Sequence, residues 1–186
     1  MRLLVRAAKA LRQRHNAGVI PMNEERVVPV DIGCEPSSVS DEVVLQHGWA
    51  TYLVMEAVSR DTRTDLGNAI VKFQASSGKY GYPNDEGMPE HPLYTKGLSE
   101  SRSAVNEVLN SMWVREIEKQ KRESRARIWG GRGIHSVDDA EPPLRHLIFS
   151  LKEGTFECVC RGFSVTYSRN SISDIVKDLV SHEPEV

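Results

Sequence analysis

The residues of this sequence best suited to chemistry lie in one proline-rich stretch, YGYPNDEGMPEHPLY, from Tyr80 to Tyr94. It contains an imidazole, His91, and two adjacent carboxylates, Asp85 and Glu86. A carboxylate that orients a histidine is the minimum equipment for general acid-base catalysis, and a proline-stiffened turn would let Asp85 or Glu86 reach His91. The stretch therefore predicts a candidate hydrolytic site at these three residues.

The same stretch fits two roles that need no catalysis. Its Pro-Asn-Asp and Pro-Glu-His-Pro segments are good turn formers, which would suit a structural cover over the rest of the fold. An irregular loop of this length is usually functional or disordered, and the prolines and tyrosines argue against disorder. We favour a contact surface for a protein partner and keep a hydrolase as the alternative. The expected contact residues are Tyr80, Tyr82, Asn84, Asp85, His91 and Tyr94.

The cysteines predict no metal centre. Cys158 and Cys160 would lie on one face of a strand, about 7 Å apart at a rise of ~3.3 Å per residue, too far for an easy disulfide. Tetrahedral zinc needs four ligands, and neither a second cysteine pair nor a His-x3-5-His spacing is present. We expect buried thiols, no metal and no cofactor. The sequence also has no P-loop, dinucleotide fingerprint, HExxH motif or nucleophile elbow.

The overall charge argues against a chain that binds nucleic acid through its whole surface. The 186 residues include 24 basic and 26 acidic side chains, a formal net charge of -2. Two local basic runs, residues 2–14 and 115–132, leave nucleic-acid binding as a third possible function. Residues 1–22 read as a basic amphipathic helix or an extension outside the fold.

The N-terminal sequence and the cysteine count bear on the cellular compartment of the protein. Arg6, Lys9 and Arg12 interrupt the region where a signal peptide would need an apolar segment. No window approaches the ~18 consecutive apolar residues of a transmembrane helix. With an odd number of cysteines, three, the sequence indicates a cytoplasmic protein.

Hydrophobic patterning predicts mostly strands in the first half of the chain. RVVPVDI reads as a strand at a sheet edge, because Pro29 cannot donate to a ladder. Residues 43–59 favour strands through their β-branched and aromatic content, with a helix as the alternative. In AIVKFQA, Val71 and Phe73 share one face, as in a strand with one buried side.

The second half combines helices and a meander. Apolar residues at helical spacing predict the longest helix from Ser103 to about Lys121, capped by Ser101 or Ser103. HLIFSL, TFECVC and FSVTYS predict three antiparallel strands, followed by a short helix with a capping box at Ser171 and Asp174. The sequence thus predicts one α+β domain over residues 23–182, with a frayed tail at 183–186. It would contain a largely antiparallel sheet of about five to seven strands, one long helix packed on it and short terminal helices.

Four segments, YGYPNDE, HPLYTKGL, VNEVLNSMWVREIEKQKR and RHLIFSLKEGTFECVC, resemble a family of short uncharacterised bacterial proteins that has similar pieces in the same order. The resemblance covers roughly residues 66–163, about half of the chain. It implies one α+β domain of bacterial origin to which the proline-rich loop belongs. The family has no established activity, so the resemblance implies no chemistry.

Overall fold

The computed structural model of the chain describes residues 24–38, 41–47, 50–74, 77–101, 103–129 and 142–181. The basic N-terminal segment predicted for residues 1–22 lies outside these residues, as do the tail at 183–186 and the end of the basic run 115–132.

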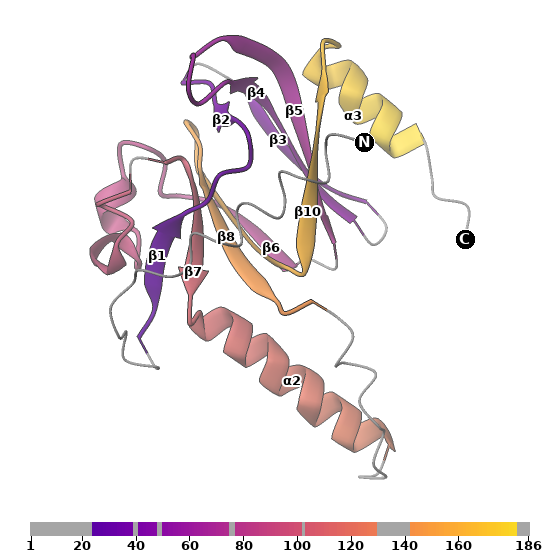
Figure 1. Cartoon of the computed structure of the whole chain (residues 1–186). Helices are drawn as coiled ribbons and strands as arrows, with labels where there is room; N and C mark the ends of the chain where they lie inside the picture. The colour runs from indigo at the N-terminus through magenta and orange to yellow at the C-terminus, as the bar shows by residue number, and fades with distance from the viewer. Residues whose placement is uncertain are drawn as a thin grey trace.

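The described residues form two antiparallel sheets of five strands each (Figure 1). The first sheet has the order β1-β7-β8-β9-β6. Its strands are β1 (Arg26–Pro29), β6 (Ser77–Gly81), β7 (Val105–Leu109), β8 (Arg145–Ser150) and β9 (Thr155–Cys160). The second sheet has the order β10-β5-β4-β2, and β3 also pairs with β4. Its strands are β2 (Glu35–Pro36), β3 (Glu42–His47), β4 (Ala50–Val58), β5 (Asp65–Gln74) and β10 (Gly162–Ser168).

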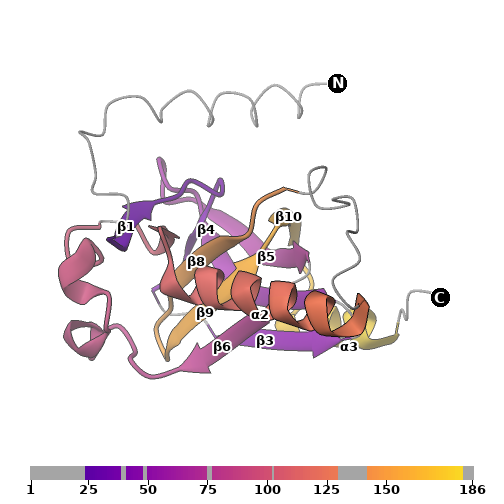
Figure 2. The same ribbon diagram turned by 90° about the horizontal axis from the view of Figure 1, so that it is seen from below.

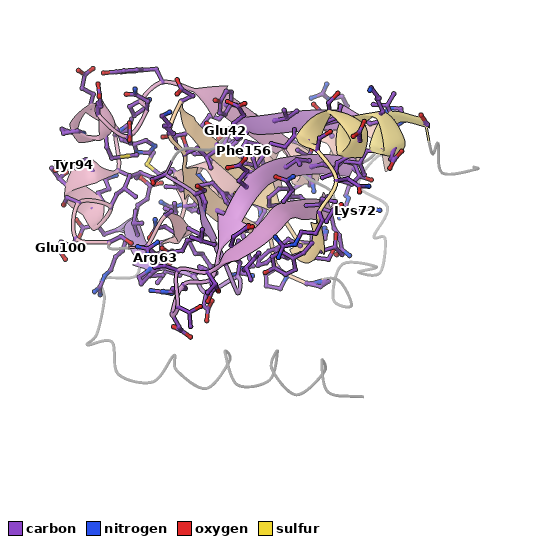
Figure 3. The ribbon with its side chains drawn as sticks, turned by 90° about the horizontal axis from the view of Figure 1, so that it is seen from above. Glu42, Arg63, Lys72, Tyr94, Glu100 and Phe156 are labelled. Carbon is purple, nitrogen blue, oxygen red and sulfur yellow. The ribbon has the colours of Figure 1, made fainter. Side chains whose placement is uncertain are left out.

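The main core lies between the two sheets. Phe73 of β5 packs its ring against Phe149 of β8 and Phe156 of β9, with ring centroids 5.6 and 5.5 Å apart. All three side chains are fully buried. Figure 3 shows Phe156 in the interior, whereas Lys72 lies on the outer side of the second sheet and Tyr94 lies at the far end of the molecule. The two sheets are held together by burial of the alternate side chains that each turns toward the other.

A second, smaller core covers the outer face of the first sheet. The chain between β6 and β7, called the loop from here on, includes most of the proline-rich stretch. Its Leu93 and Leu98 pack on Val108 of β7 and Ile148 of β8. The loop contains two short 3-10 helices, η2 (Met88–Glu90) and η3 (Tyr94–Lys96). It and the C-terminal helix lie at opposite ends of the molecule (Figure 2). The proline-rich segment is therefore ordered, and part of it covers a sheet.

Two α-helices are present among the described residues. Helix α2 (Met112–Trp129) follows β7, and only its first part contacts the first sheet. The rest projects beyond the sheets (Figure 1), with side chains 119–128 exposed. Helix α3 (Ile172–Ser181) packs on the second sheet, with Ile175 buried. Ser171 accepts the Asp174 amide hydrogen bond at 3.2 Å, which confirms the predicted cap.

The α+β composition and the antiparallel pairing are confirmed, but the prediction of a single sheet is wrong. β8 and β9 pair as predicted, whereas β10 leaves β9 after Arg161 and pairs with β5 of the second sheet. The strands predicted at 43–59 and in AIVKFQA, residues 69–75, are present, although β5 begins four residues earlier, at Asp65. β1 is an edge strand that ends at Pro29. The predicted meander thus becomes a two-strand hairpin followed by a crossing between sheets.

The predicted helix 103–121 is also wrong over its first nine residues, 103–111. Residues 105–109 form β7, and α2 begins only at Met112. Val105 faces the main core and Val108 faces the second core, so that both faces of β7 are buried. Burial on both faces removes the two-residue period by which a strand is recognised, and the remaining apolar spacing mimicked a helix.

Candidate active site

The turn between β7 and α2 places a serine at the start of a helix. Asn110 has a φ of 56°, a conformation that asparagine tolerates better than most residues. This sharp turn brings Ser111 to the position before the helix, where its Oγ accepts the Val114 amide hydrogen bond at 3.2 Å. Ser111, and not the predicted Ser101 or Ser103, is the residue that caps the helix.

A histidine and a glutamate from the β8–β9 hairpin approach this serine on the outer face of the first sheet. The register pairs His146 with Val159 and Ile148 with Glu157, so His146 and Glu157 are diagonal neighbours on one face. His146 Nδ1 lies 2.8 Å from Ser111 Oγ. On the other side of the ring, His146 Nε2 lies 2.8 Å from Glu157 Oε2. The three residues form a hydrogen-bonded chain in the order serine, histidine, glutamate.

The hydrogen-bond partners of His146 show which of its two ring nitrogens carries the proton. A carboxylate can only accept, so His146 Nε2 carries the hydrogen that it donates to Glu157. In the neutral ring Nδ1 is then an acceptor, and the hydroxyl of Ser111 donates to it. Ser111 Oγ itself accepts from the Val114 amide. This is the proton arrangement that a general base acting on a serine hydroxyl requires.

Two further groups reach the same carboxylate. His91 Nε2 lies 3.4 Å from Glu157 Oε1, and Lys79 Nζ lies 2.7 Å from that oxygen. The Leu93 amide donates to His91 Nδ1 at 3.1 Å, so the neutral ring of His91 presents an N–H group to Glu157. The loop, β6, β8 and β9 therefore all contribute to one buried polar cluster.

The carboxylate of Glu157 is buried yet ionised. Burial raises its pKa, but hydrogen bonds from His146, His91 and Lys79 and the charge of Lys79 outweigh burial and hold the pKa well below its usual range. Trp113 of α2 closes the cluster from outside. Its ring meets His146 edge-on at a centroid distance of 5.2 Å, and Lys79 Nζ lies 5.0 Å from the same ring.

A hollow of about 310 Å³ adjoins Ser111. It lies where β7 ends, α2 begins and the chain enters β8 (Figure 1). Its lining residues are Glu107, Val108, Leu109, Asn110, Ser111, Val114, Arg115, Pro143, Leu144 and Arg145. The volume is at the lower end of the range for small-molecule sites. A small substrate could therefore approach the serine from this side.

The residues predicted for the loop are only partly brought together. His91 is buried against Glu157, while Asp85 and Glu86 are exposed, and Asp85 accepts the amide hydrogen bond of Glu86. Asn84 accepts from the Gly87 amide at 2.9 Å and thus closes a turn. The carboxylate that meets His91 comes from β9, 66 residues further along the chain.

The tyrosines point in different directions. Tyr82 is 67% exposed and covers Gly87, whose position would bring a Cβ within 2.7 Å of the tyrosine ring. Tyr80 is 47% exposed, and its hydroxyl donates to Glu42 of β3 at 3.2 Å. Tyr94 is half-buried in η3. Among the three tyrosines of the predicted contact surface, Tyr80 and Tyr82 are thus the exposed ones.

Ser111, His146 and Glu157 were not among the predicted site residues. One signal was present, because the alternation in HLIFSL and TFECVC places His146 and Glu157 on the faces opposite Leu147 and Phe156. A carboxylate within a strand that is buried at all six positions must have a partner. The sequence pattern alone did not supply the register that joins them.

The described residues contain no cluster of three or more histidine, cysteine, aspartate or glutamate side chains suited to a metal ion. At Glu157 the position of a cation is taken by the ammonium group of Lys79. Both histidines present N–H groups to the carboxylate, whereas a metal ligand needs a free lone pair on that nitrogen. The cluster is thus held together by hydrogen bonds and an ion pair to one carboxylate.

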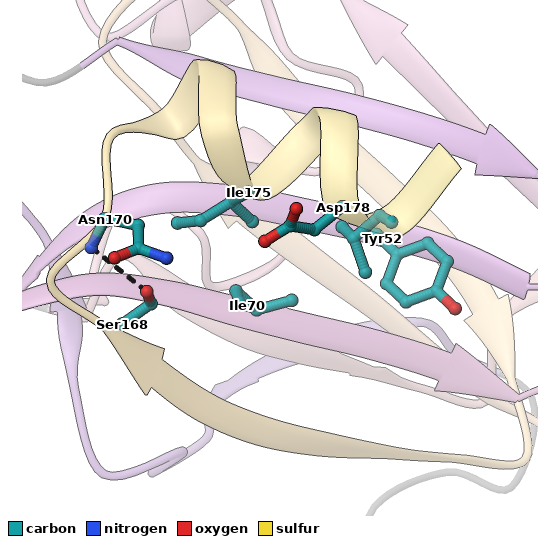
Figure 4. A pocket seen from close by; sticks show the side chains of 7 residues that line it. Tyr52, Ile70, Ser168, Asn170, Ile175 and Asp178 are labelled. Atoms are coloured by element: carbon teal, nitrogen blue, oxygen red, sulfur yellow. Dashed lines mark hydrogen bonds between the residues drawn. The ribbon is translucent and has the colours of Figure 1, made fainter. Parts of the chain in front are cut away.

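A second hollow, of about 280 Å³, lies between α3 and the outer face of the second sheet (Figure 4). Ile70 and Ile175 form an apolar floor, with Tyr52 and Asp178 toward one end. At the other end the Asn170 amide donates to the Ser168 hydroxyl at 3.1 Å. The observed contact of a hydroxyl with an imidazole is at Ser111, so we place the candidate active site there.

Comparisons of the chain with protein-family models, curated proteins and solved structures found no match. The resemblance to an uncharacterised bacterial family stays a prediction. Among the described residues, no helix is long and apolar enough to cross a membrane.

Proposed function

We propose that the protein is a hydrolase of the serine type, in which Ser111 is the nucleophile, His146 the general base and Glu157 the group that orients the base. The observation that carries the proposal is the pair of 2.8 Å contacts on either side of the His146 ring. Triads of this kind are recognised by geometry and roles, not by their order in the sequence. The hydrolase considered from the sequence is thereby kept, with different residues.

In the proposed reaction Ser111 Oγ attacks the carbonyl carbon of an ester while its proton passes to His146 Nδ1. The imidazolium that forms keeps its Nε2 proton and donates a hydrogen bond through it to Glu157. The low pKa of Glu157 keeps the carboxylate ionised. The leaving alkoxide takes the proton from His146 and departs. Water then attacks the acyl-serine and gives a proton to His146, and His146 passes that proton to Ser111 Oγ as the bond to the acyl group breaks and the acid leaves.

The developing oxyanion would be stabilised by the N-terminus of α2. The first-turn amide groups of a helix carry a partial positive charge, and the Val114 amide already points at Ser111 Oγ. When Oγ becomes part of the acyl group, this amide can turn its hydrogen bond to the oxyanion. His91 and Lys79 act as positioning residues, because they hold Glu157 without contacting the hydroxyl.

The proposal is tested by labelling with a fluorophosphonate probe, which reacts with activated serines. We expect one probe molecule per chain, located by mass spectrometry on the peptide that contains Ser111. A folded Ser111→Ala variant should take up no probe, and Ser99→Ala, at an exposed loop serine, should be labelled like the unmodified protein. His146→Gln should slow the labelling at least about 100-fold. Equal labelling of Ser111→Ala, or none of the unmodified protein, would reject the proposal.

A second candidate function is the protein contact surface expected from the sequence. Its support is the exposure of Tyr80, within the edge strand β6, and of Tyr82, just after it; the first four residues of β6 are all exposed. An open edge with aromatic neighbours can accept a strand from a partner. We expect a partner retained from a cell lysate by the unmodified protein and lost by a Tyr80→Ala, Tyr82→Ala variant. Ile128→Ala, at the exposed end of α2, is the control and should retain it.

Three further expectations from the sequence, on domain number, cellular location and nucleic-acid binding, also remain proposals. We infer one domain, because a single core cluster contains side chains of both sheets. The three cysteines are buried and free, which supports the cytoplasmic location. Nucleic-acid binding through the basic run keeps some support from α2, where residues 115–129 carry six basic and three acidic side chains.

A further inference from the structure

The hollow beside Ser111 has a composition that bears on the substrate. Its walls are largely apolar, with Val108, Leu109, Val114, Pro143 and Leu144 among the lining residues. Its volume, about 310 Å³, suits a short acyl chain better than a fatty acid or a peptide. The polar lining residues are Ser111, Asn110 and three charged side chains.

Two of the three charges neutralise each other. Arg145 donates to both oxygens of Glu107, from Nε at 3.1 Å and from an Nη at 2.8 Å. This bidentate pair is fixed in geometry, and the hydrogen bonds that Arg145 donates to Glu107 raise the pKa of Arg145. It therefore forms a rigid, electrically neutral wall and leaves no net charge for a ligand.

Arg115 is the charge that remains. It lines the hollow from the first turn of α2 and has no ion-pair partner within the part of the chain that the structure describes. Its amide donates to the Ser111 carbonyl, so the two residues are four apart on the same helical face. Such neighbours have Cβ atoms about 5–6 Å apart. The hollow thus has a net charge of +1 from Arg115, which lies one helical turn from the proposed nucleophile.

From this arrangement we propose that the hollow binds an acyl group of about four to six carbons that ends in a carboxylate, and that the substrate is an ester of a small dicarboxylic acid. The inference rests on the proposed hydrolase function. Ser111 would attack the esterified carboxyl group, while Arg115 would pair with the free one. A planar guanidinium is suited to this role because it can donate two parallel hydrogen bonds to a carboxylate.

The first experiment compares two esters of equal chain length, mono-p-nitrophenyl glutarate and p-nitrophenyl valerate. We expect kcat/KM for the glutarate ester to exceed that for the valerate ester at least tenfold. Arg115→Gln should reduce this ratio to near one. Arg122→Gln, on the exposed part of the same helix, removes an equal charge outside the hollow and should leave the ratio unchanged. A ratio near one in the unmodified protein, or a ratio unaffected by Arg115→Gln, would overturn the proposal.

A second experiment separates substrate binding from catalysis. Folded Ser111→Ala protein is titrated with glutarate and with valerate, and binding is followed by calorimetry. We expect glutarate to bind and valerate to bind at least tenfold more weakly, with the difference lost in a Ser111→Ala, Arg115→Gln variant. Binding of this kind with no turnover of either ester would reject the hydrolase and keep the carboxylate site. Turnover without the Arg115-dependent preference would reject the carboxylate site and keep the hydrolase.

Discussion

At the scale of single residues, Glu157 shows how the fold tolerates a buried charge. Removing a carboxylate from water costs several kcal/mol, so a buried one is found only with partners. Here Lys79, His91 and His146 surround it, each from a different element. The three donors do what solvent would do in the unfolded chain, and they keep the group ionised.

Replacing this carboxylate should destabilise the protein in a pH-dependent manner. Glu157→Gln turns an amide NH2 group toward the N–H of buried His146 or His91, where a carboxylate oxygen accepted before, and we expect a loss of about 3 kcal/mol in the free energy of unfolding at pH 7. The folded-state pKa of Glu157 lies below its unfolded-state value, so its stabilisation is present at neutral pH and declines as the pH falls below about 5. Urea unfolding at pH 7 and pH 3.5 measures the difference between the two proteins, which should shrink at the lower pH.

The matched control is Glu123→Gln on the exposed part of α2. Glu123 faces Lys119 at 4.0 Å, and 58% of its side chain is exposed. Its replacement should change the free energy of unfolding by less than about 0.5 kcal/mol at either pH. A Glu157→Gln variant as stable as this control would contradict the assigned role of the carboxylate.

The residue scale also limits what the sequence could predict. His91 was predicted as a site residue from its type and its place in the proline-rich stretch. Its partner was sought in Asp85 and Glu86, which are close in the sequence. Glu157 is close only in space, because η2 and the β8–β9 hairpin meet on one sheet face. Strand alternation predicts the face on which a side chain lies, whereas contacts between distant segments need the register and topology.

At the scale of elements, the junction between β7 and α2 positions the nucleophile. The apolar residues of β7 and those of α2 follow one helical spacing, so no sequence period marks the boundary. What breaks the helix is Asn110, whose positive φ turns the chain so that Ser111 can cap the helix. The single Asn110 was too weak a signal against six apolar residues at helical spacing, which are Val105, Val108, Leu109, Met112, Trp113 and Ile117.

This junction makes a prediction with two substitutions. Asn110→Ala should cost about 1–2 kcal/mol in the free energy of unfolding, because a Cβ without a local hydrogen bond disfavours positive φ. Asn110→Gly loses the same hydrogen bond from Nδ2 to the Glu24 carbonyl but tolerates the conformation. Thermal unfolding should therefore rank the glycine variant above the alanine variant. The reverse order would show that the side-chain bond, and not the backbone conformation, determines stability.

The loop on the first sheet can be tested in the same way. Gly97 has a φ of 107°, and a Cβ there would meet the Val27 carbonyl oxygen at 2.8 Å. Gly97→Ala should displace the loop from β1 and lower the free energy of unfolding by at least about 1 kcal/mol. Amide hydrogen exchange should then be faster at Leu93 and Leu98. Gly81→Ala is a useful comparison, since a Cβ at that glycine has nothing within 4 Å although its φ is also positive.

At the scale of the whole molecule, the first sheet differs from the second in how its outer face is covered. Its inner face belongs to the main core, and its outer face is covered by the loop and the start of α2. The second sheet carries α3 and leaves several outer positions exposed, among them Glu56 and Lys72. The candidate active site lies on the sheet that is covered on both sides, where water is excluded and hydrogen bonds are stronger.

The two sheets should unfold together, because they share one core. Phe73 contacts Phe149 and Phe156 across the interface, so Phe73→Leu removes ring contacts that belong to both sheets and should cost about 1–2 kcal/mol. Tyr82→Leu, at an aromatic residue that is 67% exposed, should cost less than about 0.5 kcal/mol. If the described chain is one cooperative unit, circular dichroism and tryptophan fluorescence will follow a single coincident transition in urea, shifted in Phe73→Leu to a lower midpoint for both probes. Two separated transitions, of which the substitution moves only one, would instead mean that each sheet is stable without the other.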